Sequence, residues 1–352
     1  MFHALFILCF FFFSDILFIV AWHSFCLVAD YSQNLGLPHF GGEQPGDTYY
    51  YSPLAVYIFG IVDASCSPDK LYAYGYTEDI GAKGGNNVAS LLMLAMEDFG
   101  WLSSGKCGKR LSIVMDNCSG QNKNNHVLRL ALLLVELQHF KEVEFIFYVR
   151  GHTKNVCDRM FNLLKKRYHH SQIFRVTKLT ELLNEIDNVN YIHVPSTVFF
   201  NYQLLLSLFY KIFPTGEVKK NHYFWVSDAN PTTMGRLTHH NDPYAEPQHF
   251  DHSIRMANRI TEIKLAMNNK FPLPAPGLKP IKQVELWKKW GQYIPEDERD
   301  ELCPKPTDDV IKKVAAEKAS KAKTAQRKRA STAKAAKAAA PQRKKKSQTA
   351  KV

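Results

Sequence analysis

The order of apolar patterns between residues 25 and 170 is the feature that most restricts how this chain can fold. Short β-branched or aromatic runs predict strands, and apolar residues at a spacing of three and four predict helices. The predicted strands are Phe25–Ala29, Leu54–Val62, Leu71–Tyr76, Leu111–Met115 and Val143–Val149, and the predicted helices are Asn86–Trp101, Val127–Phe140 and Val156–Tyr168. The order β-β-β-α-β-α-β-α, a meander followed by alternating units, predicts an α/β fold with a mixed sheet and helices on both faces.

The composition argues against three classes of protein. Of the 352 residues, 45% are hydrophobic, so the chain can bury a sizeable core and is not disordered along its whole length. The seven cysteines are scattered, form no CxxC pair and have no zinc-finger spacing with histidine. Neither a disulfide scaffold nor a structural zinc site is therefore expected, and a reducing compartment is the default.

The chain divides into four segments of different composition. Residues 1–24 form a hydrophobic leader, and residues 25–170 hold the α/β pattern. Residues 171–304 are expected to form an accessory helical or irregular region. Residues 305–352 are a basic low-complexity tail, which is expected to be disordered or only transiently helical.

The hydrophobic leader has three alternative interpretations. Its apolar residues outweigh Asp15 on a membrane-insertion scale, but no lysine or arginine precedes Lys70. The positive charge that orients a signal peptide or a membrane anchor is therefore missing. The leader is non-coding sequence translated from a misplaced gene start, a genuine anchor or signal, or a buried hydrophobic helix.

Almost all the excess positive charge lies in the tail. From Val310 to Val352 there are 15 lysines and arginines against one acid, Glu317, whereas the preceding 309 residues hold 30 bases and 32 acids. Two clusters of the kind associated with nuclear import or nucleic-acid binding are Arg327, Lys328, Arg329 and Arg343, Lys344, Lys345, Lys346. The tail predicts a DNA partner bound with little regard to sequence; the alternative is a solvated tail that binds nothing.

Three acidic residues are candidates for a catalytic metal site. Asp30 ends the first predicted strand, Asp116 ends the fourth, and Asp158 lies in the first turn of the last predicted helix. Ligands of open sheets collect at the carboxyl ends of strands, and converging carboxylates require a hard cation such as Mg²⁺ or Mn²⁺. Two such ions would activate a water or a 3′-hydroxyl against a phosphodiester. The alternative for each aspartate is a solubility or helix-capping role.

The turn after Asp116 is unusually rich in amides. It includes Asn122 and Lys123, which are candidates for orienting metal-bound water or holding a phosphate at a helix N-terminus. The alternative is that the turn only caps the following helix through Asn124 or Asn125.

Further candidates flank the last predicted helix. His152 is a possible metal neighbour or proton shuttle, or else a hydrogen-bond partner at a strand end. Lys165, Lys166 and Arg167 form a basic stretch that either meets phosphates or complements the helix dipole. Glu78, at the end of the third predicted strand, is a candidate fourth acid.

Several strings in this region resemble a known family when they are taken in order. They are ADYSQNLGLP, YYYSPLAVYIFGIVD, AKGGNNVASLL, MDNCSGQNKNN and RGHTKNVCDRMF. Together they resemble an uncharacterised transposase-derived domain of the ribonuclease H-like superfamily, which is similar to DDE/DDD transposases and integrases. The resemblance covers about residues 25–170 and implies a ribonuclease H-like fold with the acid triad at Asp30, Asp116 and Asp158. Ahead of Asp30 the leader replaces the DNA-binding domain that such a transposase usually carries.

The leading hypothesis is a transposase-derived, nuclear, DNA-binding protein with metal-dependent phosphodiester cleavage or strand transfer. One alternative is a catalytically inactive module that keeps the fold and uses the tail on chromatin or nucleic acid. Another is a membrane-tethered protein led by the hydrophobic segment. A degenerate fragment without function is the remaining possibility.

Overall fold

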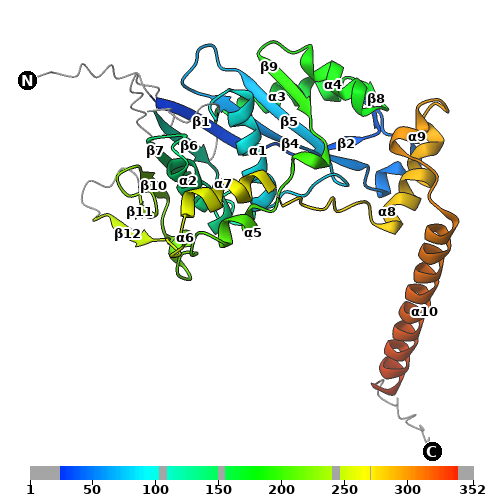
Figure 1. Ribbon diagram of the computed structural model, residues 1–352. Helices are drawn as coiled ribbons and strands as arrows, with labels where there is room; N and C mark the ends of the chain where they lie inside the picture. The colour runs from blue at the N-terminus through cyan, green and yellow to red at the C-terminus, as the bar shows by residue number, and fades with distance from the viewer. Residues whose placement is uncertain (1–23, 103–108, 150–154, 240–245, 270, 340–352) are drawn as a thin grey trace, which may run out of the picture.

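A large mixed β-sheet forms the centre of the computed structural model, which describes residues 24–102, 109–149, 155–239, 246–269 and 271–339 (Figure 1). Ten strands belong to this sheet within the described residues; nine follow the order β12-β11-β10-β7-β6-β1-β4-β5-β9, and β2 pairs with β4. Their bounds are β1 Ser24–Tyr31, β2 Leu35–Leu37, β4 Leu54–Asp63, β5 Leu71–Thr77, β6 Arg110–Met115, β7 Glu142–Phe147, β9 Val189–His193, β10 Tyr223–Ser227, β11 Thr233–Leu237 and β12 Gln248–Asp251. A separate two-stranded sheet pairs β3, His39–Phe40, with β8, Gln172–Ile173.

The predicted strands and helices occur in the predicted order β-β-β-α-β-α-β-α, and the short strands β2 and β3 are added between the first two predicted strands. The predicted strands correspond to β1, β4, β5, β6 and β7, and the predicted helices to α1 (Gly85–Asp98), α2 (Asn125–Glu136) and α3 (Val156–His169). The meander β1-β4-β5 is antiparallel, whereas β6 pairs in parallel with both β1 and β7. The protein therefore has an α/β fold built on a mixed sheet.

The alternation of side chains along β1 divides the core into two layers. Leu27 and Ala29 pack with the buried residues of α1 and α2, whereas Cys26 and Val28 pack with those of α3 and α4 (Val176–Asn184). Successive residues of a strand point to opposite faces of the sheet. Helices therefore cover both faces, as the sequence predicts.

The region from 171 to 304 differs from the expected helical or irregular accessory region. Its strands extend the central sheet at both edges: β9 pairs in parallel with β5, and β10 pairs antiparallel with β7. Strands of four or five residues carry too little pattern to be recognised alone, and these are fixed by partners far away in the sequence. The α-helices described in this region are α4, α5 (Tyr202–Ser207), α6 (Glu217–Lys220), α7 (Arg259–Asn269), α8 (Pro280–Glu285) and α9 (Arg299–Leu302).

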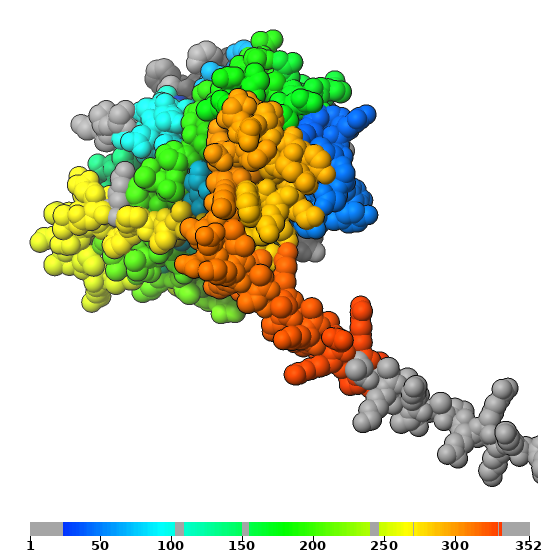
Figure 2. Space-filling model, turned by 90° about the vertical axis from the view of Figure 1, so that its right-hand side faces the viewer, coloured from blue at the N-terminus to red at the C-terminus, as the bar shows by residue number. Residues whose placement is uncertain are grey.

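The tail, which the sequence predicts to be disordered or only transiently helical, contains a long helix, α10, that spans Asp308–Ala339. It extends away from the body in both views (Figures 1 and 2). Val314 is buried against the body, whereas residues 315–329 are all exposed. Alanine, lysine and arginine have high intrinsic helix propensity, which accounts for a helix with so few packing contacts. The cluster Arg343–Lys346 lies outside the described residues.

The predicted leader, residues 1–24, lies almost entirely outside the described residues, which begin at Ser24. Within the described ranges, no helix combines the length and the apolar composition needed to cross a membrane.

Candidate functional site

Asp30 and Asp116 lie at the same edge of the sheet. Strands β1 and β6 are parallel neighbours, and Ala29 is paired in register with Met115. The residue that follows each of this pair is the aspartate, so the backbones of Asp30 and Asp116 are separated by roughly the 5 Å spacing of adjacent strands. The structure thus brings together the two acids that the sequence placed at strand ends.

The carboxylate of Asp30 is partly buried in an environment of negative charge. Burial and, after it, the charges of Asp116 and, more weakly, Asp158 together raise its pKa from an ordinary value of 3.8 to about 6. Hydrogen bonds from the Asn155 side chain (Nδ2 to Oδ2, 3.2 Å) and from the Tyr31 N–H (2.7 Å) act in the opposite direction. The three predicted acids therefore interact electrostatically across one site.

Asp116 is oriented by the turn that follows it. Its Oδ1 accepts hydrogen bonds from the Cys118 N–H at 3.0 Å and from the Asn122 side-chain amide at 2.7 Å. Asn122 is fully buried, so its amide holds the carboxylate and is withdrawn from solvent. This role differs from the nucleic-acid contact expected of Asn122.

Lys123 is also withdrawn from solvent. It is 2% exposed, its Nζ donates to the Lys219 carbonyl oxygen at 3.3 Å, and burial lowers its pKa to about 8. A buried ammonium bonded to a backbone carbonyl cannot meet a phosphate without rearrangement of the turn. This packing argues against the expected phosphate contact of Lys123, and the sequence alone does not reveal it.

Asp158 has the helix-capping role, which is one of the two that the sequence left open. Its Oδ2 accepts the Asn155 N–H at 3.2 Å, while Asn155 Oδ1 accepts the Asp158 N–H at 3.1 Å, which completes a capping box at the start of α3. Asn155 also reaches Asp30. This asparagine therefore links two of the three acids, a role that only the tertiary structure reveals.

The donor set fits a hard cation better than a soft one. Three carboxylates would supply oxygen ligands, and the pKa of Asp30 is raised first by burial and second by the negative charge of Asp116, which a divalent ion would neutralise. Among the described histidine, cysteine, aspartate and glutamate side chains, however, no group of three is arranged as a formed metal site. The hydrogen bonds to Asn122 and Asn155 hold the carboxylates in their present orientations. His152, the fourth catalytic candidate, lies outside the described residues.

A lysine that the sequence analysis did not select lies beside the acids. Lys83 Nζ donates to the Ser32 carbonyl oxygen at 3.1 Å and lies 4.7 Å from the centre of the Tyr31 ring. Burial lowers its pKa, and the negative charge of Asp30 opposes this effect. Its position directly before Gly84-Gly85, at a predicted helix start, was the available sequence signal.

The remaining candidates lie on the surface or in other contacts. Lys165 is half-buried, while Lys166 and Arg167 are exposed in the last turns of α3, where Arg167 pairs with Glu185. Glu78 accepts the Ala55 N–H and pairs with Lys282, so its carboxylate is used in a structural contact instead of joining the three aspartates. The predicted tail residues Arg327, Lys328 and Arg329 are exposed on α10.

Comparison with known proteins adds one family. A family model described as a domain of unknown function (DUF7869) matches residues 47–241, which is more than half of the chain. The matched region contains Asp116 and Asp158 but begins after β1, which carries Asp30. No curated protein and no solved structure matches the chain.

Proposed function

This chain belongs to the DUF7869 family, and we propose that it is a transposase-derived DNA-binding protein with a ribonuclease H-like domain. Its three aspartates would support metal-dependent cleavage or strand transfer of phosphodiesters. The observation that carries the proposal is the register of β1 with β6, which places Asp30 beside Asp116. Burial and, after it, the charges of Asp116 and, more weakly, Asp158 raise the pKa of Asp30 to about 6. The antiparallel meander β1-β4-β5, continued by the parallel strands β6 and β7, supports the ribonuclease H-like assignment.

The ligand atoms follow from the hydrogen bonds. Both bonds to Asp116 reach Oδ1, which leaves Oδ2 without a partner among the described residues, so we assign it to the cation. Asp30 would supply the second carboxylate, and Asn122 and Asn155 would keep the two groups oriented. Mg²⁺ or Mn²⁺, when bound, supplies the positive charge that activates water or a 3′-hydroxyl. Asp158 would add negative charge from the start of α3.

The Asp116→Asn variant tests this mechanism most directly. We expect Mn²⁺-dependent nicking of supercoiled DNA by the purified full chain to fall by at least about 10–100-fold, because the change removes a cation ligand atom or its charge. The matched control is Asp187→Asn, since Asp187 is exposed and distant from the site in the sequence. Undiminished nicking by Asp116→Asn would remove the proposed chemistry.

The basic tail is the proposed DNA-binding element. Residues 321–352 contain twelve lysines and arginines and no acid. If ten of these charges contact phosphates, the plot of log affinity against log salt has a slope of about −9. A chain ending at Ser320 keeps the buried Val314, so we expect it to fold and to show a slope near zero in a DNA titration by fluorescence anisotropy. An unchanged slope would assign the binding to the body.

A second candidate function is an inactive chromatin or nucleic-acid interaction module. Two observations favour it: no group of three ligands is formed among the described residues, and the exposed basic face of α10 is independent of the aspartates. Calorimetric titration with Mn²⁺ separates the candidates. Binding that disappears in Asp116→Asn supports the enzyme, whereas DNA binding without any Mn²⁺ binding supports the module.

We propose a nuclear location on the basis of the clusters Arg327–Arg329 and Arg343–Lys346. A membrane-tethered protein is the competing possibility, because residues 1–24 are strongly apolar. Fractionation of a chain tagged at its C-terminus would distinguish the two locations.

A further inference from the structure

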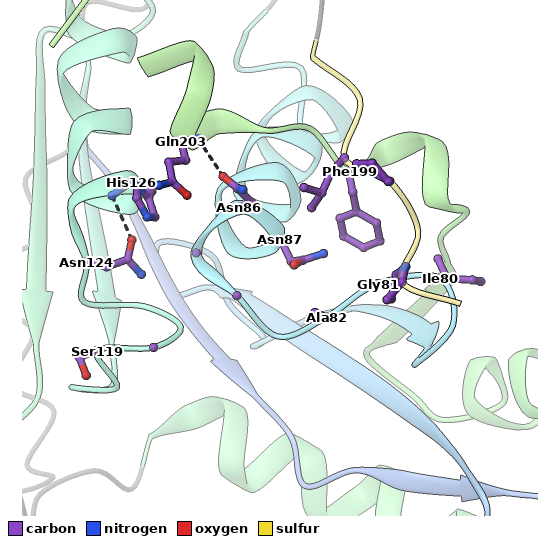
Figure 3. A pocket seen from close by; sticks show the side chains of 16 residues that line it. Ile80, Gly81, Ala82, Asn86, Asn87, Ser119, Asn124, His126, Phe199 and Gln203 are labelled. Carbon is purple, nitrogen blue, oxygen red and sulfur yellow. Dashed lines mark hydrogen bonds between the residues drawn. The ribbon is translucent and has the colours of Figure 1, made fainter. Parts of the chain in front are cut away.

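A pocket of about 420 Å³ lies where the first turns of α1 and α2 meet the loop after Asp116 (Figure 3). Its polar wall includes Gly84, Gly85, Asn87, Ser119, Gly120 and Asn124. Ser119 and Gly120 follow Asp116 by only three and four residues, so one loop borders both the aspartates and the pocket. Lys83 directly precedes Gly84 and interacts with Asp30. The pocket is therefore adjacent to the candidate site, although none of the aspartates lines it.

The two helix ends differ in how their N–H groups are satisfied. Asn124 caps α2, because its Oδ1 accepts the N–H groups of His126 and Val127 at 3.0 and 3.1 Å. The N-cap of α1 is Gly84, which has no side chain to accept a hydrogen bond. The first N–H groups of a helix have no intrahelical acceptor. The 14-residue helix α1 therefore presents uncapped donors at the pocket.

Asn87 provides independent evidence for a ligand. It is 2% exposed, it lines the pocket, and its Nδ2 has no hydrogen-bond partner among the described residues. Figure 3 shows its side chain between the wall formed by Asn124 and His126 and the opposite wall with Phe199. A buried amide donor without a partner destabilises the fold, because it has lost its hydrogen bonds to water. An acceptor inside the pocket would remove this cost.

The charge and shape of the pocket favour an anion. Its described lining contains no aspartate or glutamate, and the positive end of the α1 dipole faces it. A side chain at Gly85 would meet the Asn124 amide at 2.7 Å, so any larger residue there would displace the amide that caps α2. A side chain at Gly120 would meet nothing within 4 Å. The pocket is thus tight at the donors and open on the loop side.

We propose that this pocket binds a phosphate group through the first-turn N–H groups of α1 and the side-chain amide of Asn87. The inference rests on the proposed function in one respect, because under that function the phosphate belongs to the DNA strand that is held at the aspartates. The structure thereby moves the phosphate site from the start of α2, where the amide-rich turn predicted it, to the start of α1. The reason is that Asn124 already satisfies α2.

Titration of the full chain with inorganic phosphate in the presence of EDTA tests the site without any metal. We expect saturable binding by calorimetry, and we expect Asn87→Asp to weaken it by about tenfold or more, because a donor becomes a charged acceptor. Gln203→Glu is the second variant, since Gln203 lines the pocket with an exposed side chain that tolerates a charge. The control is Asn190→Asp on β9.

The outcomes separate this inference from the proposed function. Phosphate binding that is lost in both pocket variants and kept in Asn190→Asp supports the site. If Asn87→Asp does not fold, the phosphate binding of Gln203→Glu alone decides whether the pocket is the site. No phosphate binding by the wild type, or equal binding by the variants, overturns the inference whatever the nuclease result.

Asp30→Asn is expected to keep phosphate binding while losing nicking, and a short oligonucleotide is expected to displace phosphate if the group comes from DNA. Phosphate binding that the oligonucleotide leaves unchanged would overturn the assignment to the DNA strand.

Discussion

The Asp30→Asn variant is expected to be more stable than the wild type at pH 8, by up to about 3 kcal/mol. The pKa of Asp30 is about 6 in the folded protein against an ordinary value of 3.8, and each unit corresponds to about 1.4 kcal/mol. Because the folded pKa is the higher one, this carboxyl favours the fold only while it is protonated, and that stability is lost as the pH rises from about 4 through 6. Asparagine is neutral at both pH values, so the Asp30→Asn variant does not lose this stability as the pH rises.

Urea unfolding in EDTA at pH 4 and pH 8 measures this difference. The advantage of Asp30→Asn should appear at pH 8 and shrink towards pH 4, whereas the exposed control Asp187→Asn should match the wild type at both. Mn²⁺ should then stabilise the wild type more than Asp30→Asn, because the cation needs the charged carboxylate. A variant that is equally or less stable at pH 8 would contradict the assignment of uncompensated charge at the site.

The Glu136→Ala variant is expected to lose about 3–5 kcal/mol of unfolding free energy, the usual cost of removing one partner from a buried ion pair. Glu136, at the end of α2, is 8% exposed and pairs with Arg259 Nε at 2.5 Å. It also accepts the Tyr210 hydroxyl at 2.7 Å. The substitution removes the carboxylate partner of a mostly buried guanidinium, which keeps only the carbonyl oxygens of Ile254 and Phe209, and it leaves the buried Tyr210 hydroxyl without its acceptor.

The exposed ion pair of Arg167 and Glu185 provides the matched control. Both side chains are about half exposed, so Glu185→Ala should cost less than about 1 kcal/mol in the same urea experiment. Similar effects of Glu136→Ala and Glu185→Ala would show that the contact joining α2 to α7 contributes no more than a surface pair.

The sequence identified the acids, but it did not identify the groups that control them. Asp30 and Asp116 were recognised because each follows a strand whose β-branched pattern is local. Asn155 and Lys83 were missed because their contacts with Asp30 depend on how α3 and the turn before α1 pack on the sheet. Asn122 and Lys123 were assigned to nucleic acid because a polar turn gives no information on burial, and both are buried.

The sequence by itself determined the alternating order from β1 to α3, because hydrophobic periodicity and helix caps are properties of consecutive residues. It also determined the separation of a near-neutral body from a basic tail. Only the tertiary structure decided that β9 and β10 extend the sheet and that the start of α1 is left uncapped beside a pocket. Strand pairing and burial depend on residues distant in the sequence, so no local pattern encodes them.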